Sequence, residues 1–189
     1  MIVENKKYKI YIFVIVMLIT GIFIPLKSDL IMAQSLQELS GDKLTIEPLA
    51  DNENEYLILA QGNAFLKYKD IIISGLNAEF NTLKGTILFN DNVIFESKNY
   101  EIKGDKLSGN IDNEEFTVSG NSSFNSENIE ATADEIIYNQ REEIAYLKGD
   151  VSGKQNGREF SAQKISIDLA NEKIELTGNA RLIFPDKGE

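Results

Sequence analysis

The chain has 189 residues and a formal charge of −11, with 19 Lys and Arg against 30 Asp and Glu. It contains no Cys and no His, which excludes disulfides, Ser-His-Asp or Cys-His catalysis, and zinc sites built from those residues. The acidic balance argues against a nucleic-acid partner, because phosphate backbones are bound by clustered Lys and Arg. The length predicts one domain, or two at most.

The first 33 residues have the pattern of an export signal. Three early lysines precede an uncharged apolar run over residues 10–26, and Ala33 comes before a polar stretch that begins at Gln34. This order predicts a secretory signal peptide cleaved between Ala33 and Gln34, with an uncleaved N-terminal anchor helix in the inner membrane as the alternative. In both cases we expect residues 34–189 to be exported through the inner membrane and to form the functional domain in the periplasm.

The exported part repeats a short motif of Gly or Asn followed by Asn or Asp. Its first positions are 62, 90, 120, 149 and 178, with spacings of 28, 30, 29 and 29 residues. Each motif follows directly on a segment in which apolar and polar residues alternate. A polar turn comes before that segment, and another alternating segment comes before the turn. This pattern predicts antiparallel strands and hairpins, and no helical periodicity follows residue 40. A unit of this length cannot bury its own apolar face, so we expect successive units to stack.

The alternation gives the predicted sheets one polar and one apolar face. We therefore expect an all-β, repeat-built fold in which two sheets fold over each other as a β-jellyroll, with their apolar faces enclosing an elongated slot. An ordinary sandwich with accidental self-similarity is the alternative. The residues expected to face the slot are Ile58, Leu66, Ile94, Phe116, Val118, Leu147, Ile174, Leu176, Leu182 and Phe184.

The two ends of such a stack would each leave edge strands exposed. Leu44 and Ile46 lie on the first expected edge, and Leu176 and Leu182 lie on the last. Because edge strands are templates for pairing with other chains, the ends predict head-to-tail homo-oligomers.

No group of residues predicts a reaction. The glycine-rich segment 149–157 lacks the Gly-Lys-Ser/Thr end of a phosphate loop and lies between expected strands. The acidic pairs in segments 112–115 and 142–143 lack the alternating ligand pattern of a calcium loop and fit hairpin tips. The sequence therefore predicts neither an enzyme, nor a cofactor, nor a metal site.

The repeats resemble the OstA-like, LptA-type family of periplasmic lipopolysaccharide-transport proteins over residues 40–184. The resemblance lies in the recurring unit of two alternating strands that ends in Gly-Asn, as in AQKISIDLANEKIELTGNARL and in the corresponding segments 104–124 and 133–151. It implies a jellyroll whose interior residues bind the acyl chains of lipid A. It also implies end-to-end stacking from an inner-membrane export complex to an outer-membrane translocon. The sequence departs from the family pattern at Asn90, where Gly is expected, and at Ser122, where an apolar residue is expected.

Two other roles fit the same features. The chain could be an inner-membrane-anchored partner that hands lipid to such a bridge, if residues 10–26 are retained. It could also be a surface or structural repeat protein with a dry, fully packed interior and no lipid.

Overall fold

The computed structural model describes residues 36–49 and 52–185. The predicted leader, residues 1–33, lies outside the described residues, so the alternative between signal peptide and anchor helix stays a prediction. Within the described part of the chain, no helix is long and apolar enough to cross a membrane.

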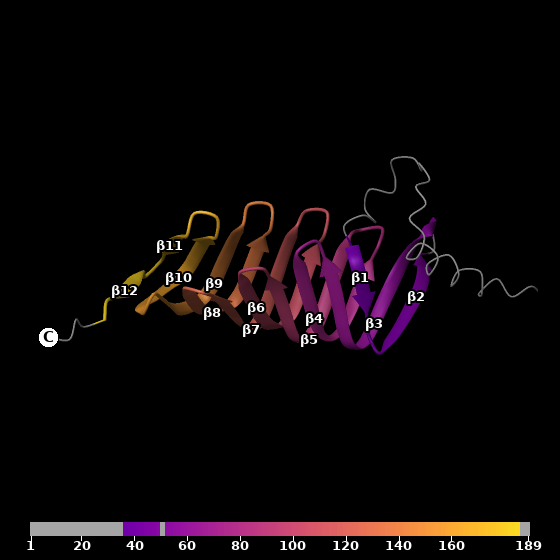
Figure 1. Ribbon diagram of the computed structural model, residues 1–189, viewed down its shortest axis with the longest axis horizontal. Helices are drawn as coiled ribbons and strands as arrows, with labels where there is room; N and C mark the ends of the chain where they lie inside the picture. The colour runs from indigo at the N-terminus through magenta and orange to yellow at the C-terminus, as the bar shows by residue number, and fades with distance from the viewer. Residues whose placement is uncertain (1–35, 50–51, 186–189) are drawn as a thin grey trace, which may run out of the picture. The chain divides into compact units, whose positions relative to one another are not determined.

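The described residues form strands joined by tight turns, as the alternating sequence predicts (Figure 1). The strands are β1 (Leu36–Ser40), β2 (Lys43–Leu49), β3 (Asn52–Tyr68), β4 (Ile71–Asn81), β5 (Thr86–Ser97), β6 (Tyr100–Asn110), β7 (Glu115–Ser126), β8 (Ile129–Asn139), β9 (Ile144–Gln155), β10 (Arg158–Asp168), β11 (Lys173–Thr177) and β12 (Arg181–Ile183).

These strands belong to one antiparallel sheet with the order β1-β3-β4-β5-β6-β7-β8-β9-β10-β11. At the ends of this order, β2 also pairs with β3, and β12 also pairs with β10. Every neighbouring pair from β3 to β11 is consecutive in the chain, so each is a simple hairpin. The all-β prediction is therefore confirmed for the described residues.

A line of bulges crosses the middle of this sheet. In β3 the pairing with β4 breaks between Gln61 and Ala64, and the two residues in between, Gly62 and Asn63, have positive φ angles of 70° and 49°. Two successive left-handed residues turn the strand sharply, and glycine adopts this conformation without steric cost. The recurring Gly-Asn motif is therefore a hinge at which each long strand bends.

The hinge positions correct one detail of the predicted repeat. In β5 the left-handed residues are Asp91 and Asn92, with φ angles of 63° and 55°, so the motif begins at Asp91 and not at Asn90. With this correction the hinges begin at residues 62, 91, 120, 149 and 178, a uniform spacing of 29. The apparent absence of Gly at Asn90 was thus an offset of one residue, and Asp91 takes the place of the glycine.

A polar side chain from the preceding strand packs against several hinges. Asn121 Nδ2 donates to Asp105 Oδ2 at 2.9 Å, and a Cβ added at Gly120 would lie 2.6 Å from the same oxygen. Asp134 occupies the corresponding place against Gly149. These hinges therefore have two requirements, a left-handed backbone and no side chain on the glycine.

The hinge line divides the folded sheet into two layers. The first layer holds the strand segments that end in the two-residue connections at 69–70, 98–99, 127–128 and 156–157, together with β1 and β12. The second layer holds the segments that end in the four-residue turns at 82–85, 111–114, 140–143 and 169–172, together with β2 and β11. The apolar side chains of both layers form one core cluster, in agreement with the predicted folded-over jellyroll.

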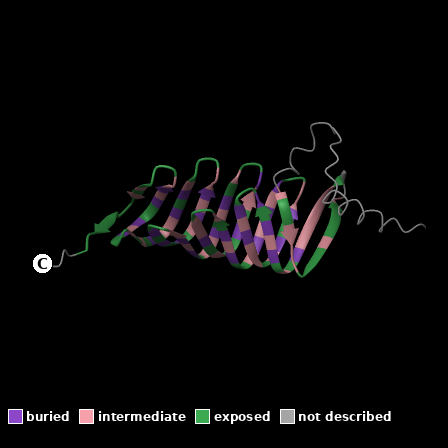
Figure 2. Cartoon of the chain, viewed as in Figure 1, coloured by how far each residue is buried: buried purple, intermediate pink, exposed green. Residues whose placement is uncertain are grey.

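Burial alternates along the inner strands of the sheet, so that one face of each layer supplies the core and the other faces outward (Figure 2). Because the unit repeats every 29 residues, equivalent interior positions form columns that run across the strands, such as Ile58, Ile87, Phe116, Ala145 and Ile174.

The hinge predicts a specific sensitivity at Gly149. Gly149→Ala should destabilise the protein by about 2–4 kcal/mol, because the left-handed backbone penalty adds to a steric clash with Asp134. The matched control is Gly157→Ala. Gly157 also has a positive φ, of 78°, but a Cβ there meets nothing within 4 Å, so this variant carries the backbone penalty alone. Urea denaturation of both variants measures the difference, and equal destabilisation would contradict the proposed contact with Asp134.

Candidate functional site

The interior between the layers contains most of the residues predicted to face the slot. Leu66, Phe116, Val118 and Leu147 are each no more than 1% exposed. Ile58, Ile174 and Leu176 are half-buried and pack against the same core. The structure therefore brings these seven residues together on the inner face of the folded sheet.

The remaining residues at the C-terminal end lie at the surface. Leu182 and Phe184 are 49% and 64% exposed. Leu182 belongs to the interior column of Leu66 and Phe124, but β12 has three residues and pairs only with β10 in the described chain. Nothing in the described residues covers this last repeat, so its apolar side chains remain in contact with solvent.

The prediction that Ile94 faces the interior is wrong. In β5 the buried residues are Ile87, Phe89, Val93 and Phe95, and Ile94 points to the outer face between two of them. The error follows from placing the hinge at Asn90, because moving a bulge by one residue exchanges the two faces of the strand beyond it. With the hinge at Asp91, the residue equivalent to Leu66 is Phe95.

An aromatic cluster that was not predicted fills the centre of the interior. Phe95 lies 5.3 Å from Phe116 and 5.5 Å from Tyr138 between ring centroids, and Tyr100 lies 5.1 Å from Tyr138. Phe95 and Tyr100 come from the first layer, whereas Phe116 and Tyr138 come from the second. The layers therefore touch each other here. The uniform 29-residue spacing would have identified Phe95 as an interior residue.

These contacts correct the expectation of an open slot. Large side chains along the interior, among them Phe89, Phe95, Phe116 and Phe124, are less than 2% exposed. Water therefore does not reach them between the layers, and the described centre is packed. A ligand that takes a place between these side chains must first separate the two layers.

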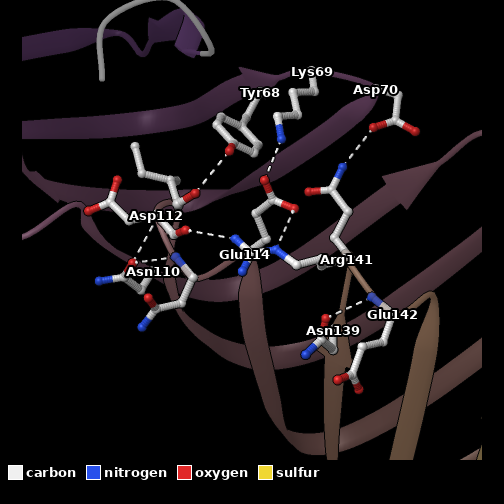
Figure 3. Close-up of polar contacts among 12 residues, drawn as sticks. Tyr68, Lys69, Asp70, Asn110, Asp112, Glu114, Asn139, Arg141 and Glu142 are labelled. Carbon is white, nitrogen blue, oxygen red and sulfur yellow. Dashed lines mark hydrogen bonds and ion pairs between the residues drawn. The ribbon is translucent and has the colours of Figure 1, made fainter. Parts of the chain in front are cut away.

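The hairpin tips of the two layers face each other along the side opposite the hinge line, which we call the mouth. Three polar contacts cross it (Figure 3). They are the hydrogen bond from the Tyr68 hydroxyl to the Ile111 carbonyl (2.9 Å), the ion pair of Lys69 with Glu114, and the hydrogen bond from Gln140 Nε2 to Asp70 Oδ1 (2.8 Å). We refer to these three contacts as the clasp.

The clasp is weak compared with the hinge. Lys69 keeps 41% of its side-chain surface exposed, and exposed ion pairs contribute only about 0–1 kcal/mol. The hydrogen bond to Glu114 raises the pKa of Lys69 above its ordinary value of 10.5. The stabilisation by the Lys69–Glu114 ion pair is therefore complete at pH values below 10.5, and it is lost only as the pH rises through the raised pKa of Lys69. The mouth is thus closed by contacts that all involve side chains, one of them with a backbone carbonyl, whereas the layers are joined at the hinge by continuous backbone.

Beside the clasp the mouth widens into a cavity of about 560 Å³. Tips of both layers line it, with Asp70, Glu114 and Gln140 of the clasp at the border and Tyr100 and Tyr138 among its deeper residues. Burial is the main cause that raises the pKa of both tyrosines. Their hydroxyls therefore remain protonated at neutral pH.

The described residues contain no group of three or more acidic side chains placed to hold a metal ion.

Fold and site together define a class of protein: an all-β jellyroll made by folding one repeat-built antiparallel sheet over an apolar interior. The family described as LptA/(LptD N-terminal domain) LPS transport protein matches residues 73–173. The chain belongs to this family, which confirms the resemblance seen in the sequence.

The fold is also similar to a solved structure. The crystal structure of LptH, the LptA homologous periplasmic component of the conserved lipopolysaccharide transport device from Pseudomonas aeruginosa, superimposes with a TM-score of 0.58. The two sequences are 14% identical, and the similarity covers 61% of this chain and 95% of LptH. Among proteins with curated descriptions, none matches the chain.

Removing the charge of Glu114 should loosen the mouth with little effect on the fold. Glu114→Gln should lower the free energy of unfolding by less than about 1 kcal/mol, and it should speed hydrogen–deuterium exchange of amides at the hairpin tips. The matched control is Glu175→Gln, which removes an ion pair with Lys173 within a single strand. If both variants leave exchange at the tips unchanged, the clasp does not hold the mouth closed.

Proposed function

We propose that this chain is a periplasmic carrier of lipopolysaccharide that shelters lipid A acyl chains between its two layers. Membership in a family of lipopolysaccharide transport proteins is the observation that carries the proposal. The interior columns support it, because apolar side chains continue from one repeat to the next along the sheet.

An apolar interior can carry a lipid without forming any specific bond. Keeping an acyl chain in water costs about 0.8 kcal/mol per CH₂ group, and an apolar lining removes that cost at every position along the interior. Contacts of this kind have no preferred direction, so a bound chain can slide from one column of side chains to the next. The net negative charge of the protein would leave phosphorylated sugar heads weakly held in solvent.

Loading requires the packed layers to part, and the structure allows this on one side. The hinge joins the layers through continuous strands, whereas the mouth is held by the clasp and by contacts between apolar side chains. Separation at the mouth would break contacts such as that of Phe95 with Phe116. Incoming acyl chains would replace these with equally apolar contacts, so the exchange costs little solvation free energy.

Photo-crosslinking in cells that express the full chain tests the proposal. A photoreactive amino acid at Leu147, which is buried on the inner face, should capture lipopolysaccharide. The same amino acid at Tyr146, the neighbouring residue on the outer face and 38% exposed, is the matched control and should capture none. Detection with an antibody against the sugar chain or by mass spectrometry reads out the adduct.

Two outcomes would contradict this function. Capture at Tyr146 but not at Leu147 would place the lipid outside the interior. Absence of lipid from both positions, in a protein that is folded and exported, would favour a structural repeat protein with a permanently packed centre.

We also propose that several copies bridge the two membranes by end-to-end pairing. Both ends carry edge strands in both layers: β1 and β2 pair only with β3, and β11 and β12 pair only with β10, among the described strands. Leu44 and Ile46 on β2 are 45% and 53% exposed, and Leu182 is 49% exposed. Joining the first end of one copy to the last end of another would pair these free edges and cover their apolar side chains.

Complementary edge variants test the direction of assembly. Ile46→Lys disables the first end and Leu182→Lys disables the last end, so each variant alone should remain monomeric in sedimentation velocity. A mixture of the two should form dimers, because each variant keeps the end that the other has lost. Leu83→Lys, at a hairpin tip where the leucine is 52% exposed, should assemble as the unmodified chain does. Failure of the mixture to dimerise would contradict head-to-tail pairing.

A further inference from the structure

The mouth cavity combines an apolar floor with a polar rim. Ile129, Tyr138 and Ile167 line it and are buried, whereas residues of the hairpin tips, such as Asn99 and Asn128, form its outer border. An apolar floor beneath a polar rim matches a molecule that changes from apolar to polar over a short distance. The cavity therefore has the character of a site for the junction of an amphiphile, beyond the acyl-chain interior described above.

Two buried polar atoms on the cavity wall, the Tyr100 hydroxyl and Gln140 Oε1, form no hydrogen bond of normal geometry. The side chains of Ser97 and Tyr138 lie close enough to the Tyr100 hydroxyl to interact with it, but not in a position that satisfies it fully. Gln140 Nε2 donates to the Asp70 carboxylate, which can only accept hydrogen bonds. The orientation of the Gln140 amide is therefore fixed, and Oε1 is the atom left without a partner. Buried polar groups in proteins are almost always paired. A donor and an acceptor both left unpaired at one cavity indicate that a ligand supplies the missing partners when the tips separate.

The charge of the rim indicates which ligand group fits. Six carboxylates line the cavity, those of Asp70, Glu114, Glu127, Glu143, Asp168 and Glu172, and Lys98 supplies the single ammonium group of the lining. Because Glu114 is paired with Lys69 and lies 3.9 Å from Arg141, the excess negative charge comes from the other five. Glu114, Glu143 and Glu172 all have positive φ angles, at the turn position that Gly85 occupies in the first repeat. Since a side chain is unfavourable in this backbone conformation, a carboxylate at each of three successive turns argues for a role at the rim. Such a rim repels phosphate and accepts uncharged groups.

We propose that the mouth cavity binds the uncharged, hydrogen-bonding junction between the sugar and the acyl chain of an amphiphile, with Tyr100 donating to it and Gln140 accepting from it. The inference rests on the proposed function, because the carried lipid must pass the mouth to reach the interior. It assigns the phosphate groups of the head to solvent beyond the rim.

Two probes with the same dodecyl tail distinguish binding of a sugar head group from binding of a phosphate head group. Protein isolated from cells that express the full chain is titrated calorimetrically with dodecyl β-D-maltoside and with dodecyl phosphate, both kept monomeric. The sugar probe should bind more tightly. Tyr100→Phe should weaken binding of the sugar probe by about three- to tenfold, the loss of one hydrogen bond, and should leave binding of dodecyl phosphate unchanged. Tyr146→Phe, which alters a hydroxyl on the outer face, is the matched control and should change neither.

Thermal unfolding distinguishes a binding role from a structural one. Because the Tyr100 hydroxyl forms no hydrogen bond of normal geometry in the free protein, Tyr100→Phe should leave the midpoint unchanged or raise it. A lowered midpoint, unchanged binding of the sugar probe, or tighter binding of dodecyl phosphate would each overturn the proposal. If Leu147 still captures lipid in cells while Tyr100→Phe has no effect, the carrier function stands without this site. If Tyr100→Phe weakens the sugar probe but Leu147 captures nothing, the site stands without that function.

Discussion

The left-handed backbone at the middle of each repeat, a pair of residues at most hinges and Gly149 alone in β9, is the constraint on which the architecture depends. Without the bends at positions such as Gly62 and Gly120, the long alternating strands would form a single extended sheet with one apolar face in water. The bends bring the two halves of that face together. Asp105 and Asp134 hold the bends from the neighbouring strand, so hinge geometry and apolar burial support each other along the whole sheet.

This arrangement makes the two sides of the fold mechanically different. The hinge side consists of continuous backbone and ladder hydrogen bonds, and the mouth side consists of the clasp and aromatic contacts such as that between Phe95 and Tyr138. The aromatic contacts are replaceable by other apolar groups and the exposed clasp contributes little, whereas a strand is not replaceable in this way. Separation of the layers at the mouth would therefore leave the β-sheet pairing intact.

Most of the fold could be predicted from the sequence, because strand alternation and turn residues are local signals. The all-β class and the repeat followed from them. Ile94 was assigned to the wrong face because its hinge contains Asp91 where other hinges contain glycine, and composition alone does not reveal the offset. The packed centre was missed for a different reason. Whether Phe95 meets Phe116 or leaves a gap depends on the distance between layers, which no local pattern encodes. The unpaired Tyr100 hydroxyl could not be predicted for the same reason, because its surroundings also depend on how the two layers pack.

The uniform 29-residue period has a consequence for how such proteins change in length during evolution. Duplicating or deleting one whole period adds or removes two neighbouring strands, which alters the sheet by about 9–10 Å, and it leaves every interior column and both terminal edges intact. A partial period would instead break the alignment of the columns, and a shift by one residue would exchange inner and outer faces of the strand. Gene duplication can therefore change the length of the sheet in fixed steps, without redesigning either end.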